Sequence, residues 1–366
     1  MAYEKTKSSI KGANIMPVIN KPNQHFDVLT WSGTGGGSGA TRSITGLNFQ
    51  PDLIWEKSRT SGTNHQLLDS VRGVGQNKSI ATSSTGAEPT AAGTESLYGW
   101  LSAINTDGFT LTNGTSTFDN WNKSGDDYVG WTWKAGGAAV ANTSGSISSQ
   151  VSVNSTAGFS VVTYTSPNTL VNETVGHGLG AVPQFIITKN RDDVFNWDIW
   201  HKDLSSGYGL VFEDGGESSG RWPTTTPTSS VFSVKYNYEH TSTNRYVAYC
   251  WAPVAGYSAF GSYTGNNSAT DGPFIYTGFR PRFVMIKRIP TTGNWNITDT
   301  ARNPYNNTTV ALRPNSAATE STVGTVYVQP VSNGFKITNN NSDTNASSTY
   351  IYACWAEAPF KYASAR

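Results

Sequence analysis

The stretch Tyr128-Val-Gly-Trp-Thr-Trp133 decides the fold, because it returns twice in the chain without a gap. The other copies are Tyr246-Val-Ala-Tyr-Cys-Trp251 and Tyr350-Ile-Tyr-Ala-Cys-Trp355. All three are rich in aromatic and β-branched residues, which favour strands. A strand-like segment that recurs at intervals of roughly 100 residues predicts a repeated structural unit.

A second landmark precedes each of these segments. It is an apolar run that starts at a proline and ends in lysine: Pro51–Lys57, Pro183–Lys189 and Pro281–Lys287. Proline cannot donate to a strand ladder, so it marks the first residue of a strand. Apolar residues at consecutive positions are typical of a central strand that is buried on both faces. Because the landmarks keep the same order three times, we predict three tandem modules.

Each predicted module carries short alternating or β-branched runs that are broken by Gly, Asn, Asp and Pro. This pattern predicts an all-β fold of three tandem antiparallel β-sandwich modules, jelly-roll-like in character. The second and third modules adjoin at residues 255–258, so we expect them to be fixed relative to each other. The predicted boundaries are an N-terminal arm at 1–25, modules at 26–137, 158–256 and 257–366, and a linker at 138–157 with room for one strand.

The charge balance and composition exclude several classes of partner. Lys and Arg number 26 against 25 Asp and Glu, a net charge of +1, whereas nucleic-acid binders show a clustered basic excess. No run of about 18 apolar residues exists, so we expect no membrane insertion. Residues 1–20 are polar and lack the apolar core of a signal peptide, which predicts synthesis in a cytoplasm.

The chain shows no spacing typical of a catalytic, metal or cofactor site, and we predict that it is not an enzyme. Cys250 and Cys354 occupy equivalent positions where the first module has Thr132, so they are interpreted as core filler. Asp and Arg stand three residues apart in Asp69-Ser-Val-Arg72 and Asp299-Thr-Ala-Arg302, which indicates structural ion pairs. A pair of carboxylates that cleaves a glycosidic bond stays open as an alternative, because such acids meet only in space.

The tryptophans divide into those that recur and those that do not. Recurrence indicates packing, and this group comprises Trp133, Trp251, Trp355, Trp197 and Trp295. Among the others, Trp121 and Trp222 lie in polar, turn-rich segments. This setting suggests exposed rings that stack on sugars. Packing within loops or against a neighbouring subunit is the alternative. The candidate glycan or partner contacts are Trp121, Trp222, Trp200 and Trp100.

The N-terminal arm has no counterpart in the modules and carries Lys5, Lys7 and Lys11. We interpret it as a segment that docks onto another subunit or partner.

Several longer strings in the chain are similar to a known family. They include Gly46-Leu-Asn-Phe-Gln-Pro-Asp-Leu-Ile-Trp55, His65-Gln-Leu-Leu-Asp-Ser-Val-Arg-Gly73, Gly176-His-Gly-Leu-Gly180, Ser258-Ala-Phe-Gly-Ser-Tyr-Thr-Gly265 and Asp271-Gly-Pro-Phe-Ile-Tyr-Thr-Gly278. Together they resemble an uncharacterised repeated domain of structural proteins in tailed bacteriophages, especially marine ones. The resemblance covers nearly everything after residue 25 and brings no catalytic residues with it.

The resemblance implies a bacteriophage virion protein, made in the cytoplasm of the bacterial host. We expect a tail fibre or tail-associated adhesin that binds host-surface glycan through multivalent contacts. The arm would attach it to other virion proteins, and closed symmetry favours a homotrimer. The alternatives are a capsid decoration protein or another purely architectural component, and then a polysaccharide depolymerase.

Overall fold

The computed structural model describes residues 19–88, 95–116, 120–168, 171–235, 243–304, 310–322 and 328–358. This part of the chain is almost entirely β, with antiparallel sheets of the sandwich type, which confirms the predicted fold class. Its two helical segments are η1 (Pro22–Gln24) and α1 (Glu95–Tyr98). Within the described residues, no helix has the length and apolar character needed to cross a membrane. Lys5, Lys7 and Lys11 lie outside the described residues.

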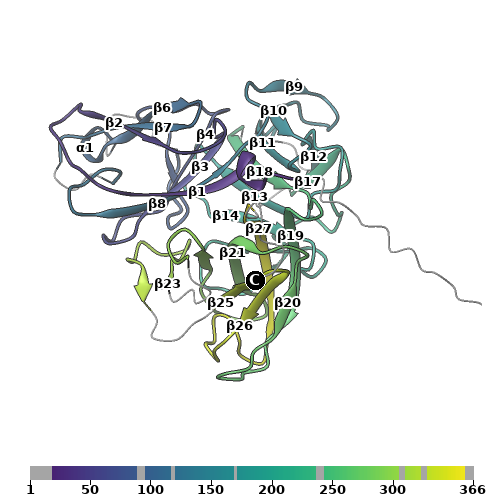
Figure 1. Ribbon diagram of the computed structural model, residues 1–366. Helices are drawn as coiled ribbons and strands as arrows, with labels where there is room; N and C mark the ends of the chain where they lie inside the picture. Colours follow the sequence, from purple (N-terminus) through teal and green to yellow (C-terminus); the bar gives the residue numbers. More distant parts are fainter. Residues whose placement is uncertain are drawn as a thin grey trace, which may run out of the picture.

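Three main sheets form the body of the molecule (Figure 1). The first has the order β1-β8-β3-β4-β5, with β1 Phe26–Ser32, β8 Asp127–Trp133, β3 Leu53–Ser58, β4 Gln66–Asp69 and β5 Ile80–Ala81. The third has the order β19-β27-β21-β22, with β19 Ser258–Thr264, β27 Thr349–Ala356, β21 Pro281–Arg288 and β22 Asn296–Asp299.

The second main sheet is the largest, with eight strands in the order β16-β15-β14-β13-β18-β11-β10-β9. Their bounds are β16 Ser218–Ser219, β15 Tyr208–Val211, β14 Trp197–His201, β13 Phe185–Asn190, β18 Arg245–Trp251, β11 Phe159–Thr165, β10 Ser149–Asn154 and β9 Val140–Asn142.

The centres of the three sheets have the same strand order and matching register. In each, the strand that holds the repeated motif lies between the strand that opens the module and the strand behind the proline. The last tryptophan of the motif faces one residue on each side: Trp133 faces Phe26 and Leu53, Trp251 faces Phe159 and Phe185, and Trp355 faces Ser258 and Phe283.

Smaller antiparallel sheets accompany the main ones. They are β2-β7-β6 (Thr41–Thr45, Gly108–Thr112, Trp100–Asn105), β12-β17 (Glu173–Gly176, Val231–Val234), β20-β26-β25 (Phe274–Tyr276, Gly334–Ile337, Val328–Val331) and β23-β24 (Val310–Ala311, Ser321–Thr322). Alternate residues of β3 show the resulting layers. Ile54 packs with Phe109 of β7, whereas Leu53 and Trp55 face the opposite side of the sheet. Each main sheet is therefore buried on both faces, as its unbroken apolar strands require.

One apolar core joins the inner faces of all three main sheets. Trp133, Trp251 and Trp355 meet there, with ring centroids 5.9, 5.3 and 5.8 Å apart and edge-to-face geometry. Figure 1 shows the three sheet assemblies arranged around this centre. The three main sheets are thus joined through a shared core and not only through their connecting segments.

Two boundary segments differ from their predicted roles. The segment 138–157 was expected to be a linker with room for one strand. It holds two strands, β9 and β10, which extend the second sheet beyond β11. Val151 of β10 is 1% exposed, so burial of alternate apolar residues holds the segment on the body. The end of the expected docking arm also packs inward, because Ile19 is part of the shared core.

Candidate functional site

The tryptophans expected on sugar-binding platforms are not exposed. Trp121 and Trp222 are each 1% exposed and Trp200 is 9% exposed, while Trp100 is half-buried on β6. Trp200 and Trp222 stack on each other, with ring centroids 6.2 Å apart. The expected exposure of Trp121, Trp222 and Trp200 is therefore wrong, and their burial agrees with the alternative of packing within the protein.

The polar neighbours of Trp121 explain the error. The Oδ1 atom of Asn122 accepts hydrogen bonds from Thr34 N at 3.0 Å and from Arg42 Nη1 at 2.8 Å. Asn122 thus connects loop segments, and the indole beside it packs with Trp31 and Phe109 in an apolar cluster. Polar residues around an aromatic ring indicated a turn, not an exposed ring.

The recurring tryptophans and the cysteines are buried. Trp197 donates its Nε1 hydrogen to Ala81 O at 2.8 Å, and Trp295 donates to Val211 O at the same distance. Each bond joins one module to the preceding one. Cys250 and Cys354 are free thiols in two different apolar clusters, and burial raises the pKa of both.

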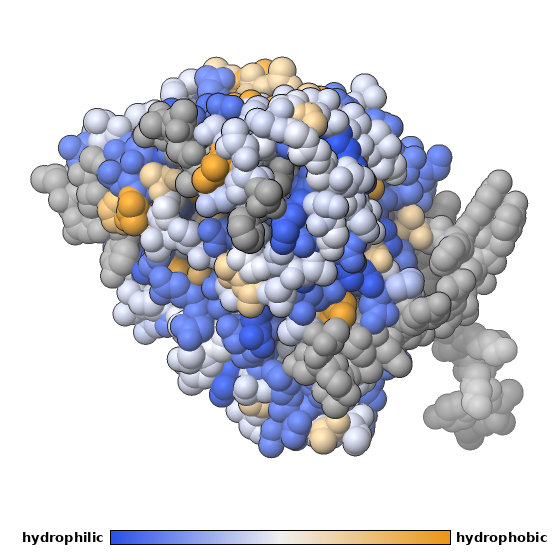
Figure 2. Space-filling model, turned by 90° about the vertical axis from the view of Figure 1, so that its left-hand side faces the viewer, coloured by the Kyte–Doolittle hydropathy of each residue, from blue (hydrophilic) through white to orange (hydrophobic). Residues whose placement is uncertain are grey.

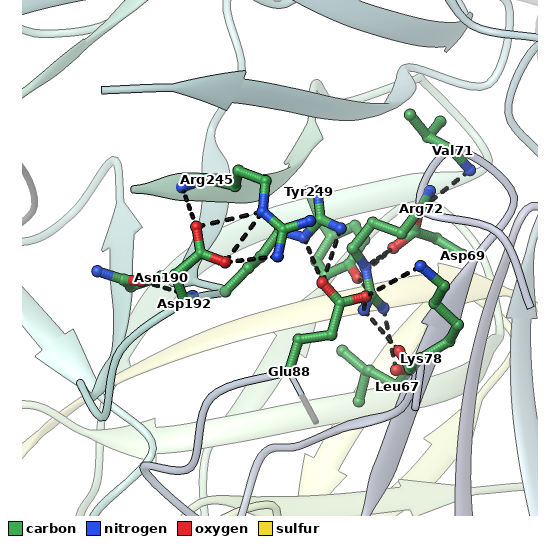
Figure 3. Close-up of polar contacts among 11 residues, drawn as sticks. Leu67, Asp69, Val71, Arg72, Lys78, Glu88, Asn190, Asp192, Arg245 and Tyr249 are labelled. Carbon is green, nitrogen blue, oxygen red and sulfur yellow. Dashed lines mark hydrogen bonds and ion pairs between the residues drawn. The ribbon is translucent and has the colours of Figure 1, made fainter. Parts of the chain in front are cut away.

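A buried ion pair lies at the junction between the first and second sheets (Figure 3). Arg72 Nε is 2.5 Å from Asp69 Oδ2, and both side chains have zero exposure. Tyr249, on β18 of the second sheet, donates its hydroxyl hydrogen to the same carboxylate oxygen at 2.8 Å. Burial raises the pKa of Tyr249 well above its ordinary value, so this hydroxyl keeps its proton and remains a donor.

Further charged groups extend this junction toward the surface. Glu88 Oε2 accepts from Arg191 Nη2 at 2.7 Å, and Glu88 Oε1 is 3.5 Å from Arg72 Nη1. The Glu88 amide also donates to Arg191 O at 2.8 Å. Figure 3 shows Arg191's neighbour Asp192 paired with Arg245, at 2.5 Å. The charges therefore alternate along this series, and the charge of each residue is compensated by its neighbours. The series is Arg72, Glu88, Arg191, Asp192 and Arg245.

The junction between the third and first sheets repeats the inner part of this arrangement. Arg302 Nε is 2.6 Å from Asp299 Oδ2, which also accepts from Trp131 Nε1 at 3.0 Å. Although burial alone would raise the pKa of Asp299, the charge of Arg302 and the hydrogen bonds hold that pKa below its ordinary value.

Glu320 has the role of Glu88 at this junction. It pairs with Arg302 at 2.7 Å and with Arg59 at 2.8 Å, and its amide donates to Arg59 O at 2.7 Å. Because the same groups recur at two junctions, we assign them to the scaffold and not to catalysis.

The junction between the second and third sheets has a different composition. His201 stands where the other modules have aspartate, and its Nε2 lies 3.3 Å from Tyr352 O on β27. Ile289 stands where the other modules have Arg59 and Arg191, and its carbonyl still accepts from the Glu217 amide at 2.6 Å. At this junction a neutral imidazole therefore stands where the other two have a buried ion pair.

His201 gives the molecule a predicted pH dependence. Burial is the largest cause and lowers the pKa of His201 to about 4. The charge of Asp203 opposes it, and the charge of Lys202 lowers the pKa by a smaller amount. The folded-state pKa lies below the unfolded value of about 6.5, so stability is complete above pH 6.5 and is lost as pH falls toward 4. We expect protonation of His201 to lower the free energy of unfolding by about 2 kcal/mol between pH 7 and pH 5.

Urea denaturation of wild type and His201→Gln at pH 7 and pH 5 measures this loss of unfolding free energy. The variant should lose about 2 kcal/mol less than wild type over the interval, because glutamine stays neutral. Lys202→Gln, one residue away and partly exposed, serves as the control and should keep most of the wild-type pH dependence. Equal losses in wild type and His201→Gln would contradict the assignment.

A polar groove of about 510 Å³ opens beside the first junction. Its lining includes Arg191 and Arg245, each of which already pairs with a carboxylate. The lining also includes Gln150 and Thr163, which are paired across β10 and β11. None of the groove's lining residues is a carboxylic acid, so the groove itself offers no acid pair for hydrolysis of a glycosidic bond. The full lining is Ser146, Ile147, Ser148, Ser149, Gln150, Thr163, Tyr164, Thr165, Pro167, Arg191 and Arg245.

Within the described ranges, no three His, Cys, Asp or Glu side chains are grouped so that they could hold a metal ion. The chain has two pairs of adjacent aspartates, Asp126-Asp127 and Asp192-Asp193, and the first carboxylate of each pair contacts a basic side chain. Asp126 lies 3.4 Å from Lys123 Nζ, and Asp192 binds Arg245.

Comparison with known proteins places the chain in a family but assigns no activity. A family model described as "Domain of unknown function (DUF7483)" matches residues 21–359. The match runs across all three sheets, in agreement with their shared core. Neither a curated protein nor a solved structure was found to match the chain.

Proposed function

The chain belongs to the family described as Domain of unknown function (DUF7483), and we propose that it serves as a non-enzymatic structural component of a tailed-bacteriophage particle. The likeness of its longer strings to phage structural proteins motivates the proposal. The contacts of the ionisable groups also support it, because these groups pair with one another inside the protein.

The observation that carries the proposal is the cyclic set of contacts between the sheets. Glu88, Glu217 and Glu320 each donate a backbone hydrogen bond to the following sheet, and the third of these returns to the first sheet. The chain therefore closes on itself. Hydrogen bonds from Tyr249 and Trp131 connect its two buried ion pairs to a neighbouring sheet. These charged groups pair with one another and are not directed at a substrate. Such an arrangement suits a load-bearing component better than a catalyst.

Among virion roles, the architectural one has the most support. The adhesin hypothesis depended on exposed indole rings, and Trp121 and Trp222 are buried. Figure 2 shows a face on which hydrophilic residues dominate and apolar residues stand in small separate areas. Tail fibre, other tail component and capsid decoration protein all remain within the proposal. Association into a homotrimer stays a prediction that light scattering tests.

Immunogold electron microscopy tests the proposal directly. Antibodies against the chain should label intact particles of a phage that encodes it, at a constant place on each particle. Antibodies against a capsid protein of the same phage provide the positive control. Label confined to host-cell debris, with unlabelled particles, would contradict a structural role.

The depolymerase alternative has its own test. Purified protein incubated with host surface polysaccharide should release no new reducing ends above the level of heat-unfolded protein. Saccharide release that depends on folded protein would replace the architectural proposal with an enzymatic one.

A further inference from the structure

Two exposed aromatic rings occupy strand positions that are small in the other modules. In β20, Ile275 is paired with Phe335, and the same pairing joins Ile44 to Phe109 in β2 and Val175 to Phe232 in β12. This register matches Phe274 and Tyr276 with Ser43 and Thr45 in the first module. In the second module the matching residues are Thr174 and Gly176.

The fold does not require these rings. The inward residues are buried in all three strands, with Ile44 and Ile275 at 6% exposure and Val175 at zero. Phe274 and Tyr276, in contrast, are 50% and 69% exposed. Since two modules make the same strand with small side chains, the rings of the third serve a purpose other than packing.

The geometry of the strand places both side chains on the same face. Residues two apart in a strand point to the same face and lie about 7 Å apart. A Cβ atom on Gly334 would come within 3.0 Å of Phe274 Cε2, and one on Gly278 within 3.6 Å of the Tyr276 hydroxyl. Both rings thus lie against glycine backbone. Their strand, β20, is an edge strand of the sheet β20-β26-β25 (Figure 1).

Charged hydrogen-bonding groups border the rings. Lys336, on β26, is the direct neighbour of Phe274 across the two strands. Its Nζ atom is 2.5 Å from Asp271 Oδ1, and the Asp271 side chain is 81% exposed. The cluster, which we call the β20 aromatic face, consists of Phe274, Tyr276, Lys336 and Asp271.

We propose that the β20 aromatic face binds a saccharide. A pyranose has apolar C–H faces that pack on aromatic rings, and its hydroxyls accept from an ammonium and donate to a carboxylate. The two rings together expose on the order of 250 Å², far below the roughly 800 Å² that each partner buries in a stable protein interface. The area fits one or two sugar rings, and the ion pair leaves the face without a net charge that would select a charged protein. This binding activity goes beyond the architectural role and does not depend on it.

The matched module supplies the test variant. Phe274→Ser combined with Tyr276→Thr gives the third module the residues that the first carries at these positions. Wild type, this double variant and Val182→Thr are applied to an array of bacterial surface polysaccharides, and the strongest hit is titrated. Val182 is 47% exposed and lies elsewhere in the chain, so its substitution controls for loss of an apolar surface group.

We expect wild type and Val182→Thr to bind the same polysaccharide, and the double variant to bind it about 10- to 100-fold more weakly, roughly 3- to 10-fold for each ring. The melting temperature of the double variant should equal that of wild type. Equal binding by wild type and the double variant, or no binding to any polysaccharide, would overturn the proposal. Sedimentation showing self-association that the double variant abolishes would also overturn it, because a second copy would then be the occupant.

Discussion

Asp299→Ala is expected to lower the free energy of unfolding by about 3–5 kcal/mol. The substitution leaves the guanidinium of Arg302 buried and deprived of its nearest carboxylate, and Trp131 Nε1 loses its acceptor. Glu320 still pairs with Arg302, so the charge is not wholly uncompensated. Urea denaturation at pH 7, followed by tryptophan fluorescence, measures the change.

Two variants make the result for Asp299 specific. Asp299→Leu combined with Arg302→Met removes both charges and should regain a large part of the loss, because an apolar pair needs no charge compensation. Lys202→Gln breaks a partly exposed pair with Asp203 and should cost less than about 1 kcal/mol. A loss below 1 kcal/mol for Asp299→Ala would show that the buried pair does not bind the sheets together.

Trp355→Ala is expected to cost about 3–5 kcal/mol, the range for truncating a large buried aromatic side chain. Its ring is 1% exposed and contacts Trp133 of the first sheet and Trp251 of the second, at centroid distances of 5.3 and 5.8 Å. The cavity would open between all three sheets. Calorimetry should therefore show one unfolding transition at a lower temperature.

The half-buried Trp100 provides the matched control, and Trp100→Ala should cost less than about 2 kcal/mol. If Trp355→Ala instead separates a low-temperature transition of the third sheet from an unchanged remainder, the modules unfold independently. That outcome would contradict a core shared by all three.

Much of the fold was predictable because strands that are buried on both faces have apolar residues at consecutive positions. The prolines at 51, 183 and 281 and the apolar runs behind them indicated central strands, and β3, β13 and β21 lie next to β8, β18 and β27. The ion pair Asp69–Arg72 was also predictable from its spacing and its recurrence.

The candidate sites were less predictable, because exposure depends on contacts between distant segments. Trp222 has polar neighbours in sequence, yet its ring packs on Trp200 from another strand. The β20 aromatic face was missed, although alignment of Phe274-Ile-Tyr276 with Ser43-Ile-Thr45 would have found it. The alignment was not evident from the sequence. It follows from the pairing of Ile275 with Phe335, which matches that of Ile44 with Phe109.

The amino-acid sequence by itself determined the all-β class and the strands at the centre of each sheet, because alternation, β-branching and proline act within a few residues. Only the tertiary structure decided how the sheets close around one another. Tyr249 meets Asp69 and Trp131 meets Asp299 across separations of 180 and 168 residues. No local pattern specifies such partners, since burial and charge compensation are properties of the assembled core.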